Sequence, residues 1–252
     1  MKRLIKLSYL GKNFCGYQAQ SVGRSVQGEL TRAAAELFGV RCDITGCSRT
    51  DSGVHANTFC ATVSERGGLG LSTSLSIERI PRAFNAHLPE DISVFSAEWV
   101  DDSFHPRYDV KYKEYIYRIY LGEQRNPFEY GRSLFYGQNI GYEAIEKMNA
   151  AASQFVGKHD FASFMAQGSS VSSTVREVMY ADVKREGDIL VFRVAADGFL
   201  YNMVRIMMGT LIAVAKGKIQ PDAISEIIEA KDRSLAGMTV SPEGLYLNKV
   251  EY

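Results

Sequence analysis

The sequence has no excess of charge of either sign, since 29 lysines and arginines balance 29 aspartates and glutamates over its 252 residues. No overall field would draw a polyanion to the molecule, so nucleic-acid binding would have to come from a local basic surface. Cysteine is scarce, and its four residues fall in the first quarter of the chain, at Cys15, Cys42, Cys47 and Cys60. They lack the spacing of a zinc knuckle and no paired histidine motif follows, so we expect no metal site.

Membrane and nucleotide-binding signals are also missing. The longest apolar run, 200–214, is broken by Asn202, Arg205 and Gly209, and it is too short and too polar to span a bilayer. No signal peptide follows Met1. The glycine-rich stretch 67–70 lacks the Lys-Ser/Thr ending of a P-loop, and no serine elbow occurs. We therefore expect a soluble, cytoplasmic protein with no cofactor signature and no membrane partner.

Instead, strands and helices alternate along the first part of the chain. Residues 3–9 alternate as a strand, Ser25 is a good N-cap for a helix that Gly39 ends, and two strands flank the turn around Asp51. Pro81 suits the first turn of a short helix, and a fourth strand is predicted over 92–100. The resulting β-α-β-β-α-β order is the ferredoxin-like pattern.

The second part resembles a longer version of that order. Strands are predicted over 113–121, 175–184, 189–195 and 245–250, and helices over 142–155, over 200–215 and from Pro221 onward. We therefore predict the α+β fold class, with an N-terminal domain over residues 1–103 and a C-terminal domain over residues 104–252.

The stretch from Gly46 to Ala56 combines reactive side chains with glycines. An arginine, a carboxylate and a histidine lie in one polar turn between two strands, at Arg49, Asp51 and His55. A carboxylate held at a strand end beside a cation, which keeps it ionised, can act as a nucleophile or a base. The run from Asp51 to Gly53 is also ordinary turn chemistry, and the segment alone favours that simpler interpretation.

Arg205 is a charge within an apolar helix. Its helical neighbours are methionine, isoleucine, leucine and valine, so the charge is costly unless a carboxylate or another anion meets it. A surface arginine whose stem covers apolar neighbours explains the pattern equally well.

The strand around Tyr115 interleaves tyrosines with arginines and lysines over residues 107–120. Aromatic faces and cations are what an unstacked base and its phosphates require. A tyrosine-rich core strand with a charged, solvated edge explains the same spacing, which taken alone favours that simpler alternative.

Together these segments resemble the tRNA pseudouridine synthase A family over essentially the whole length and in the family's order. The segment from Arg49 to Ala56 resembles the catalytic signature, and further matching segments are 9–20, 25–27, 85–92, 104–108, 113–117, 157–161, 198–205 and 243–247. Any one motif is weak, but so many in register are highly specific. Four residues depart from the family pattern without removing a proposed catalytic group: Tyr17, Ser48, Ser52 and Pro106.

The resemblance implies an isomerase that converts uridine to pseudouridine at positions 38, 39 and/or 40 of the tRNA anticodon stem-loop. It further implies a homodimer, no cofactor or metal, and two ferredoxin/RRM-like halves that share a central, mostly antiparallel sheet flanked by helices. Asp51 would be the nucleophile and Arg205 its partner. The residues that hold the flipped base and its RNA would be Tyr115, Leu245, Arg49 and His55.

Two other classes of function account for part of the pattern. A non-catalytic, RRM-like RNA-binding protein explains the split βαβ order and the aromatic strand, but leaves Asp51 and Arg205 unexplained. A carboxylate-dependent lyase or isomerase of a small molecule fits the neutral net charge. Binding of tRNA that weakens steeply with added salt would exclude the small-molecule enzyme.

Overall fold

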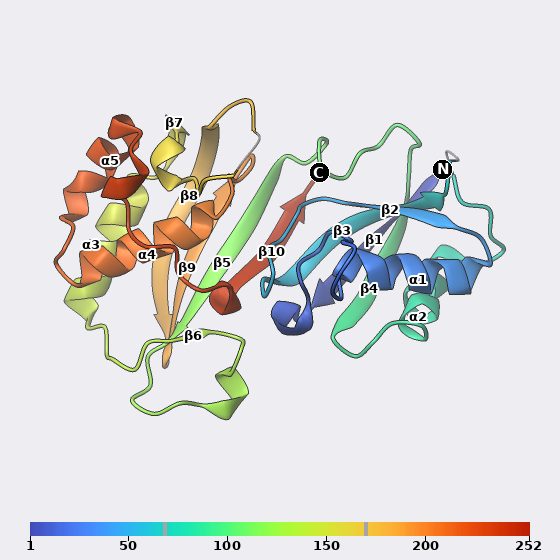
Figure 1. Cartoon of the computed structure of the whole chain (residues 1–252), viewed down its shortest axis with the longest axis horizontal. Helices are drawn as coiled ribbons and strands as arrows, with labels where there is room; N and C mark the ends of the chain where they lie inside the picture. Colours follow the sequence, from blue (N-terminus) through green and yellow to red (C-terminus); the bar gives the residue numbers. More distant parts are fainter. Residues whose placement is uncertain (68–69, 169–170) are drawn as a thin grey trace. The chain divides into compact units, whose positions relative to one another are not determined.

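The computed structural model of the chain describes residues 1–67, 70–168 and 171–252. It contains two compact units (Figure 1): Met1–Lys111 with Tyr246–Tyr252, and Tyr112–Leu245. Both units are α+β with mainly antiparallel strands, which confirms the predicted fold class. The domain limits predicted at 103/104 left the last strand with the C-terminal half. Here its residues from Tyr246 onward belong to the first unit, in which Tyr246 pairs with His55 and Leu247 with Ala56.

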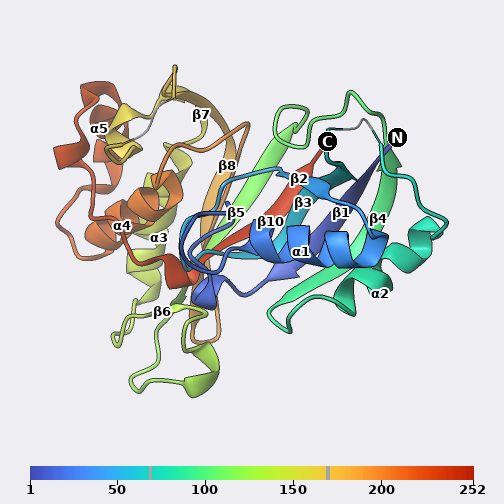
Figure 2. The same ribbon diagram turned by 45° about the vertical axis from the view of Figure 1, so that its right-hand side comes forward.

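The first unit has the predicted β-α-β-β-α-β order, followed at the chain's end by one more strand. Its elements are β1 (Lys2–Tyr9), α1 (Val26–Phe38), β2 (Cys42–Gly46), β3 (His55–Glu65), α2 (Ile80–Asn85), β4 (Ile92–Val100) and β10 (Leu245–Glu251). β1 pairs antiparallel with both β3 and β4, and Figure 2 shows α1 and α2 side by side against this sheet. The glycine-rich stretch 67–70 lies partly outside the described residues.

β3 changes partners along one of its edges. Its C-terminal half pairs antiparallel with β2, where Gly46 lies opposite Ala61. Its first residues pair in parallel with β10, where His55 lies opposite Tyr246. Residues 47–54 form the connection between the end of β2 and the start of β3, which confirms the predicted strand, turn and strand. This connection, called the signature loop below, therefore starts and ends at fixed strand ends.

The signals that predict α1 act as expected. The Ser25 hydroxyl accepts a hydrogen bond from the Gly28 amide at 3.2 Å, and Gly39 ends the helix in the left-handed conformation at φ 69°. The inward face carries Val26, Leu30, Ala33 and Ala34, all buried. Packing of this apolar face is what stabilises a helix of this length.

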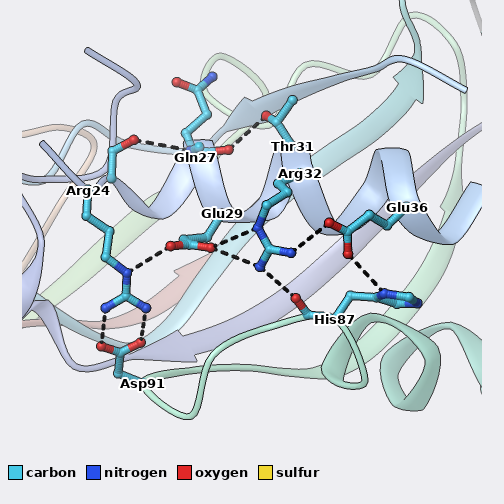
Figure 3. Close-up of polar contacts among 10 residues, drawn as sticks. Arg24, Gln27, Glu29, Thr31, Arg32, Glu36, His87 and Asp91 are labelled. Atoms are coloured by element: carbon cyan, nitrogen blue, oxygen red, sulfur yellow. Dashed lines mark hydrogen bonds and ion pairs between the residues drawn. The ribbon is translucent and has the colours of Figure 1, made fainter. Parts of the chain in front are cut away.

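A network of charged side chains ties the outer side of α1 to the segment before β4 (Figure 3). Arg24 forms two hydrogen bonds with the Asp91 carboxylate, at 2.7 and 2.9 Å, and a third with Glu29 at 2.8 Å. Arg32 then joins Glu29 to Glu36 and donates to the His87 carbonyl. The paired contacts of Arg24 fix the chain just before α1, since a bidentate guanidinium–carboxylate pair has a defined geometry.

The second unit is a four-stranded antiparallel sheet with a short additional strand. Its elements are β5 (Tyr112–Tyr120), β6 (Leu134–Phe135), α3 (Tyr142–Ser153), β7 (Gly157–Asp160), β8 (Val175–Glu186), β9 (Ile189–Ala196), α4 (Met203–Ala215) and α5 (Ile224–Ala230). The strand order is β5-β9-β8-β7, and β6 pairs in parallel with β5. α3 packs on β8 and α4 on β5. Among the described residues, every helix is too short or too polar to span a bilayer.

Candidate active site

The residues predicted for the site lie in both compact units. The first unit contributes Arg49, Asp51 and His55 from the signature loop and the start of β3. The second contributes Tyr115 from β5, Arg205 from α4 and Leu245, the first residue of β10.

The backbone on both sides of Asp51 is anchored. On one side, the Thr50 carbonyl accepts a hydrogen bond from the Tyr17 amide at 3.1 Å, and the Thr50 hydroxyl pairs with the Tyr9 hydroxyl at 2.7 Å. On the other side, the Ser52 hydroxyl donates to the Phe14 carbonyl at 3.2 Å. Because both neighbours of Asp51 are held, its half-buried side chain leaves the loop in a defined direction.

The anchors come from the loop that follows β1, residues 10–20. Its Phe14 ring lies under the Arg24 guanidinium, whose carbon is 4.4 Å from the ring centre. The same Arg24 is fixed by Asp91 in the network of Figure 3. The charged network on α1 therefore supports the segment that holds the signature loop.

Two glycines allow the two loops to touch. A Cβ atom on Gly11 would lie 1.9 Å from the Val54 carbonyl oxygen. A Cβ on Gly16 would lie 2.8 Å from the Thr50 carbonyl oxygen, and Gly16 has φ +113°, which residues with a side chain rarely adopt. Any side chain at either position would therefore push the signature loop away.

We expect Gly16→Ala to lower turnover by about 100-fold, because a displacement of about 1 Å at a reacting group has an effect of that size. Gly39→Ala is the matched control, since Gly39 also has a positive φ, at 69°, but a Cβ there would meet nothing within 4 Å. It should cost only the strain of a left-handed residue, about 1–2 kcal/mol of stability, and keep its activity. Equal losses of turnover in the two variants would contradict the positioning role of Gly16.

The three residues of the first unit differ in accessibility. Arg49 is exposed and Asp51 is half-buried, whereas the His55 ring is fully buried. Nδ1 of His55 accepts a hydrogen bond from the Gly11 amide at 2.9 Å, and the ring stacks on Tyr246 with centroids 4.5 Å apart. His55 thus joins the loop after β1, the signature loop and β10.

Arg205 is held by neutral acceptors. Its Nε donates to the Val240 carbonyl and its Nη1 to the Asn202 side-chain oxygen, both at 2.7 Å. Asn202 lies at the N-cap position of α4 in a left-handed conformation, at φ 61°, and its side chain makes no capping hydrogen bond there. Arg205 is the one charged residue of α4 and is half-buried. These two neutral acceptors orient the guanidinium and do not themselves neutralise its positive charge.

Val240 belongs to a segment that crosses α4 in backbone contact. A Cβ on Gly209 would lie 1.8 Å from the Met238 carbonyl oxygen, and the Gly237 amide donates to the Thr210 hydroxyl at 2.8 Å. This close crossing brings the Val240 carbonyl to Arg205. The small residues in the otherwise bulky helix therefore have a structural purpose that the hydrophobic pattern did not reveal.

The same segment leads to β5 and to Leu245. The Ser241 carbonyl accepts a hydrogen bond from the Tyr117 hydroxyl at 2.6 Å. Burial raises the pKa of Tyr117 above its usual range, while the hydrogen bond to Ser241 and, more weakly, the charge of Arg205 lower it. Tyr115 lies two residues before Tyr117, on the same face of β5. Its ring packs edge to face with the ring of Phe199, with the two ring centroids 5.0 Å apart. In the second unit, Tyr115 and Tyr117 therefore share one face of β5, Arg205 lies near Tyr117, and Leu245 is buried.

The supporting residues were not found by sequence reasoning. Most of the anchors are backbone groups, such as the carbonyls of Phe14 and Val240, which any residue type supplies. The paired glycines Gly11 and Gly16 were the available signal, because a glycine can mark the close approach of another chain segment.

The cysteines are free thiols. Burial raises the pKa of the Cys60 thiol to about 12, so it stays protonated near neutral pH and packs as a small apolar group. Within the described ranges, no group of three histidine, cysteine, aspartate or glutamate side chains is placed to hold a metal ion.

Comparison with known proteins points to a single family. A family model described as tRNA pseudouridine synthase matches residues 6–109 and 151–252. tRNA pseudouridine synthase A of Thermoanaerobacter sp. (strain X514) is 40% identical over 250 residues, which cover 99% of this chain and 98% of that protein. The protein of the same name from Staphylococcus carnosus (strain TM300) is 38% identical, covering 99% of this chain and 90% of that protein.

The same name applies to a relative in Acetivibrio thermocellus, 39% identical over 98% of this chain and 97% of that protein. One solved structure, a chain of a Cbf5-Nop10-Gar1 complex, aligns with 82% of this chain over 53% of its own length, at 12% identity. Its TM-score of 0.34 is too low to bear on the argument. The full-length matches define an RNA-modifying isomerase. The chain belongs to the tRNA pseudouridine synthase family, which confirms the resemblance seen in its motifs.

Proposed function

We propose that this chain converts uridine to pseudouridine at positions 38, 39 and/or 40 of the tRNA anticodon stem-loop, with Asp51 as the nucleophile. The observation that carries the proposal is the anchoring of Thr50 and Ser52, which fixes Asp51 in a half-buried position within a chain of this family. Carbodiimide mapping of pseudouridine in tRNA treated with the protein tests it.

The proposed reaction conserves every atom. The bond from the sugar carbon C1′ to uracil N1 breaks, the base turns, and a bond from C1′ to uracil C5 forms. The hydrogen on C5 is lost and N1 gains one, so nothing is oxidised or reduced. A carboxylate that attacks the nucleoside divides one difficult displacement into two easier steps. An isomerisation that is balanced in this way requires neither a redox cofactor nor a group carrier.

We further propose that Arg205 pairs with Asp51 and keeps it ionised. The guanidinium already has a fixed orientation, set by Val240 and Asn202, and its charge is not cancelled by those neutral groups. A preoriented cation stabilises an anionic group without the cost of rearrangement. This pairing accounts for a charged residue in an apolar helix.

The remaining site residues are proposed to hold the flipped nucleotide. Tyr115 would stack on the base, Leu245 would line the pocket, and exposed Arg49 would contact the RNA. His55 would support the RNA through the signature loop, since its buried ring binds the Gly11 amide. The protein is proposed to work in the cytoplasm as a homodimer on tRNA.

Substitutions at Tyr115 test the stacking role. Tyr115→Phe keeps the ring and removes the hydroxyl, whereas Tyr115→Ala removes both. If the ring stacks on a base, alanine should weaken tRNA binding by roughly 1–3 kcal/mol and phenylalanine by much less. Titration of labelled, unmodified tRNA measures both affinities. Equal losses in the two variants would argue against stacking.

A further inference from the structure

A projecting loop between β5 and α3, residues 121–141, carries an exposed aromatic surface. Figures 1 and 2 show it extending from the body of the second unit, with β6 at its base. It falls within residues 110–150, which the family model leaves unmatched. The family model gives no information about this loop, so its role is inferred from its own residues.

Residues 125–132, called the aromatic knuckle below, have a fixed conformation. The Asn126 side chain caps a single 3-10 turn, Pro127–Glu129, by accepting the Phe128 amide at 3.0 Å. The Glu129 carboxylate accepts two hydrogen bonds from Arg118 of β5, at 3.2 and 3.3 Å. The Glu129 carbonyl accepts the Arg132 amide at 2.9 Å. The knuckle is thus closed at both ends and attached to the sheet.

This fixed turn presents two large aromatic side chains to solvent. Phe128 is 83% exposed and Tyr130 75% exposed. Exposed aromatic groups on a rigid turn favour binding, because little side-chain entropy is lost when a partner covers them. Their flat faces offer the surface on which nucleic-acid bases stack.

The knuckle also has the charge that RNA requires. Arg125 and Arg132 are both exposed, and the Glu129 charge is met by Arg118. The chain as a whole has no net charge, so its contacts with a polyanion must be local. Arginine beside exposed rings combines phosphate contact with stacking, a combination found in sites for single-stranded nucleic acid.

We propose that the aromatic knuckle binds unpaired nucleotides of the tRNA substrate, with a base on Phe128 or Tyr130 and phosphates on Arg125 and Arg132. The proposal rests on the proposed function, because it takes tRNA as the substrate. A second copy of the chain is the competing occupant. RNA is favoured because the two exposed arginines complement its phosphates, whereas a symmetric contact with a second copy would bring the same positive charges together.

Affinity measurements with the full chain test this proposal. Phe128→Ala should raise the Kd for unmodified tRNA by about 5- to 150-fold, the range found for the loss of one stacked base. Phe128→Trp should restore it, and turnover at saturating tRNA should stay unchanged in both. Tyr142→Ala is the matched control, since Tyr142 is 81% exposed but belongs to α3. It should bind tRNA like the unaltered protein.

A fluorescence experiment detects the stacking itself. The chain has one tryptophan, Trp99, so the double variant Trp99→Phe with Phe128→Trp carries a single reporter in the knuckle. Its emission should be quenched when unmodified tRNA is added. Arg125→Gln should reduce the slope of log K against log salt by about 0.7–0.9, the value for one phosphate contact.

The proposal is overturned if Phe128→Ala binds tRNA as tightly as the unaltered protein, or if Tyr142→Ala loses as much affinity. It is also overturned if sedimentation shows that Phe128→Ala dissociates an oligomer while each subunit keeps its tRNA affinity. Pseudouridine formation by the unaltered protein separates these outcomes from failure of the proposed function. That activity would persist if only the knuckle assignment were wrong.

Discussion

Replacing Asp51 by asparagine is expected to lower turnover by at least about 10⁴-fold while leaving the fold and tRNA binding intact. The amide has nearly the shape of the carboxylate, but it lacks the negative charge and the nucleophilic oxygen, and loss of a nucleophile has effects of that size. The hydrogen bonds that fix the loop come from Thr50 and Ser52, so they survive the change. Single-turnover kinetics with unmodified tRNA measure the loss.

The control for this experiment is the neighbouring Ser52→Ala. This variant removes the hydroxyl that donates to the Phe14 carbonyl but retains the Asp51 carboxylate. The Gly53 amide still donates to the Phe14 carbonyl, at 3.4 Å. We expect at most a tenfold loss of turnover, from a slightly looser loop. Turnover of Asp51→Asn within tenfold of the unaltered protein would exclude Asp51 as the nucleophile.

Arg205→Met is expected to lower turnover by about 10²- to 10³-fold, the effect of removing one preoriented electrostatic group. Methionine suits the apolar helix, but the Val240 carbonyl and the Asn202 side chain each lose a donor. The free energy of unfolding should fall by about 1–3 kcal/mol, because Val240 is buried and its carbonyl loses the Arg205 donor. A carboxylate that loses a nearby cation is protonated at higher pH, so the acidic limb of the rate profile should move upward.

Two further variants separate charge from geometry at Arg205. Arg205→Lys keeps the charge but loses the planar fork, so it should restore little turnover. Asn202→Ala removes one acceptor of Arg205 and keeps the guanidinium, so its effect should be smaller than that of either substitution at Arg205. Unchanged turnover and an unchanged pH profile in Arg205→Met would contradict the proposed pairing with Asp51.

Sequence patterns predict the first unit well because its signals are local. Ser25 and Gly39 bound α1 at the expected residues, and β4 occupies residues 92–100 as predicted.

In the second unit, the prediction missed β7, whose residues Gly157–Asp160 include a lysine, a histidine and an aspartate and lack apolar alternation. Pairing with β8 makes it a strand, which is a tertiary effect that propensity does not contain.

The candidate site was only partly accessible to the same reasoning. Arg205 was recognisable because its charge conflicts with its apolar helix, whereas Asp51 lies in a polar turn and was singled out by the resemblance of its segment to the catalytic signature. The groups that hold them, such as the Phe14 and Val240 carbonyls, have no signature in the sequence. The parallel pairing of β10 with β3, which places Tyr246 against His55, joins residues nearly two hundred positions apart and leaves no local trace.

The most direct test of the central claim is a pseudouridine map of unmodified tRNA after incubation with this protein. Carbodiimide marks pseudouridine, and primer extension then stops beside each marked residue. We predict stops that report pseudouridine at positions 38, 39 and/or 40 with the unaltered protein and none with Asp51→Asn. A tRNA without pseudouridine after prolonged incubation, or the same stops from both proteins, would contradict the account.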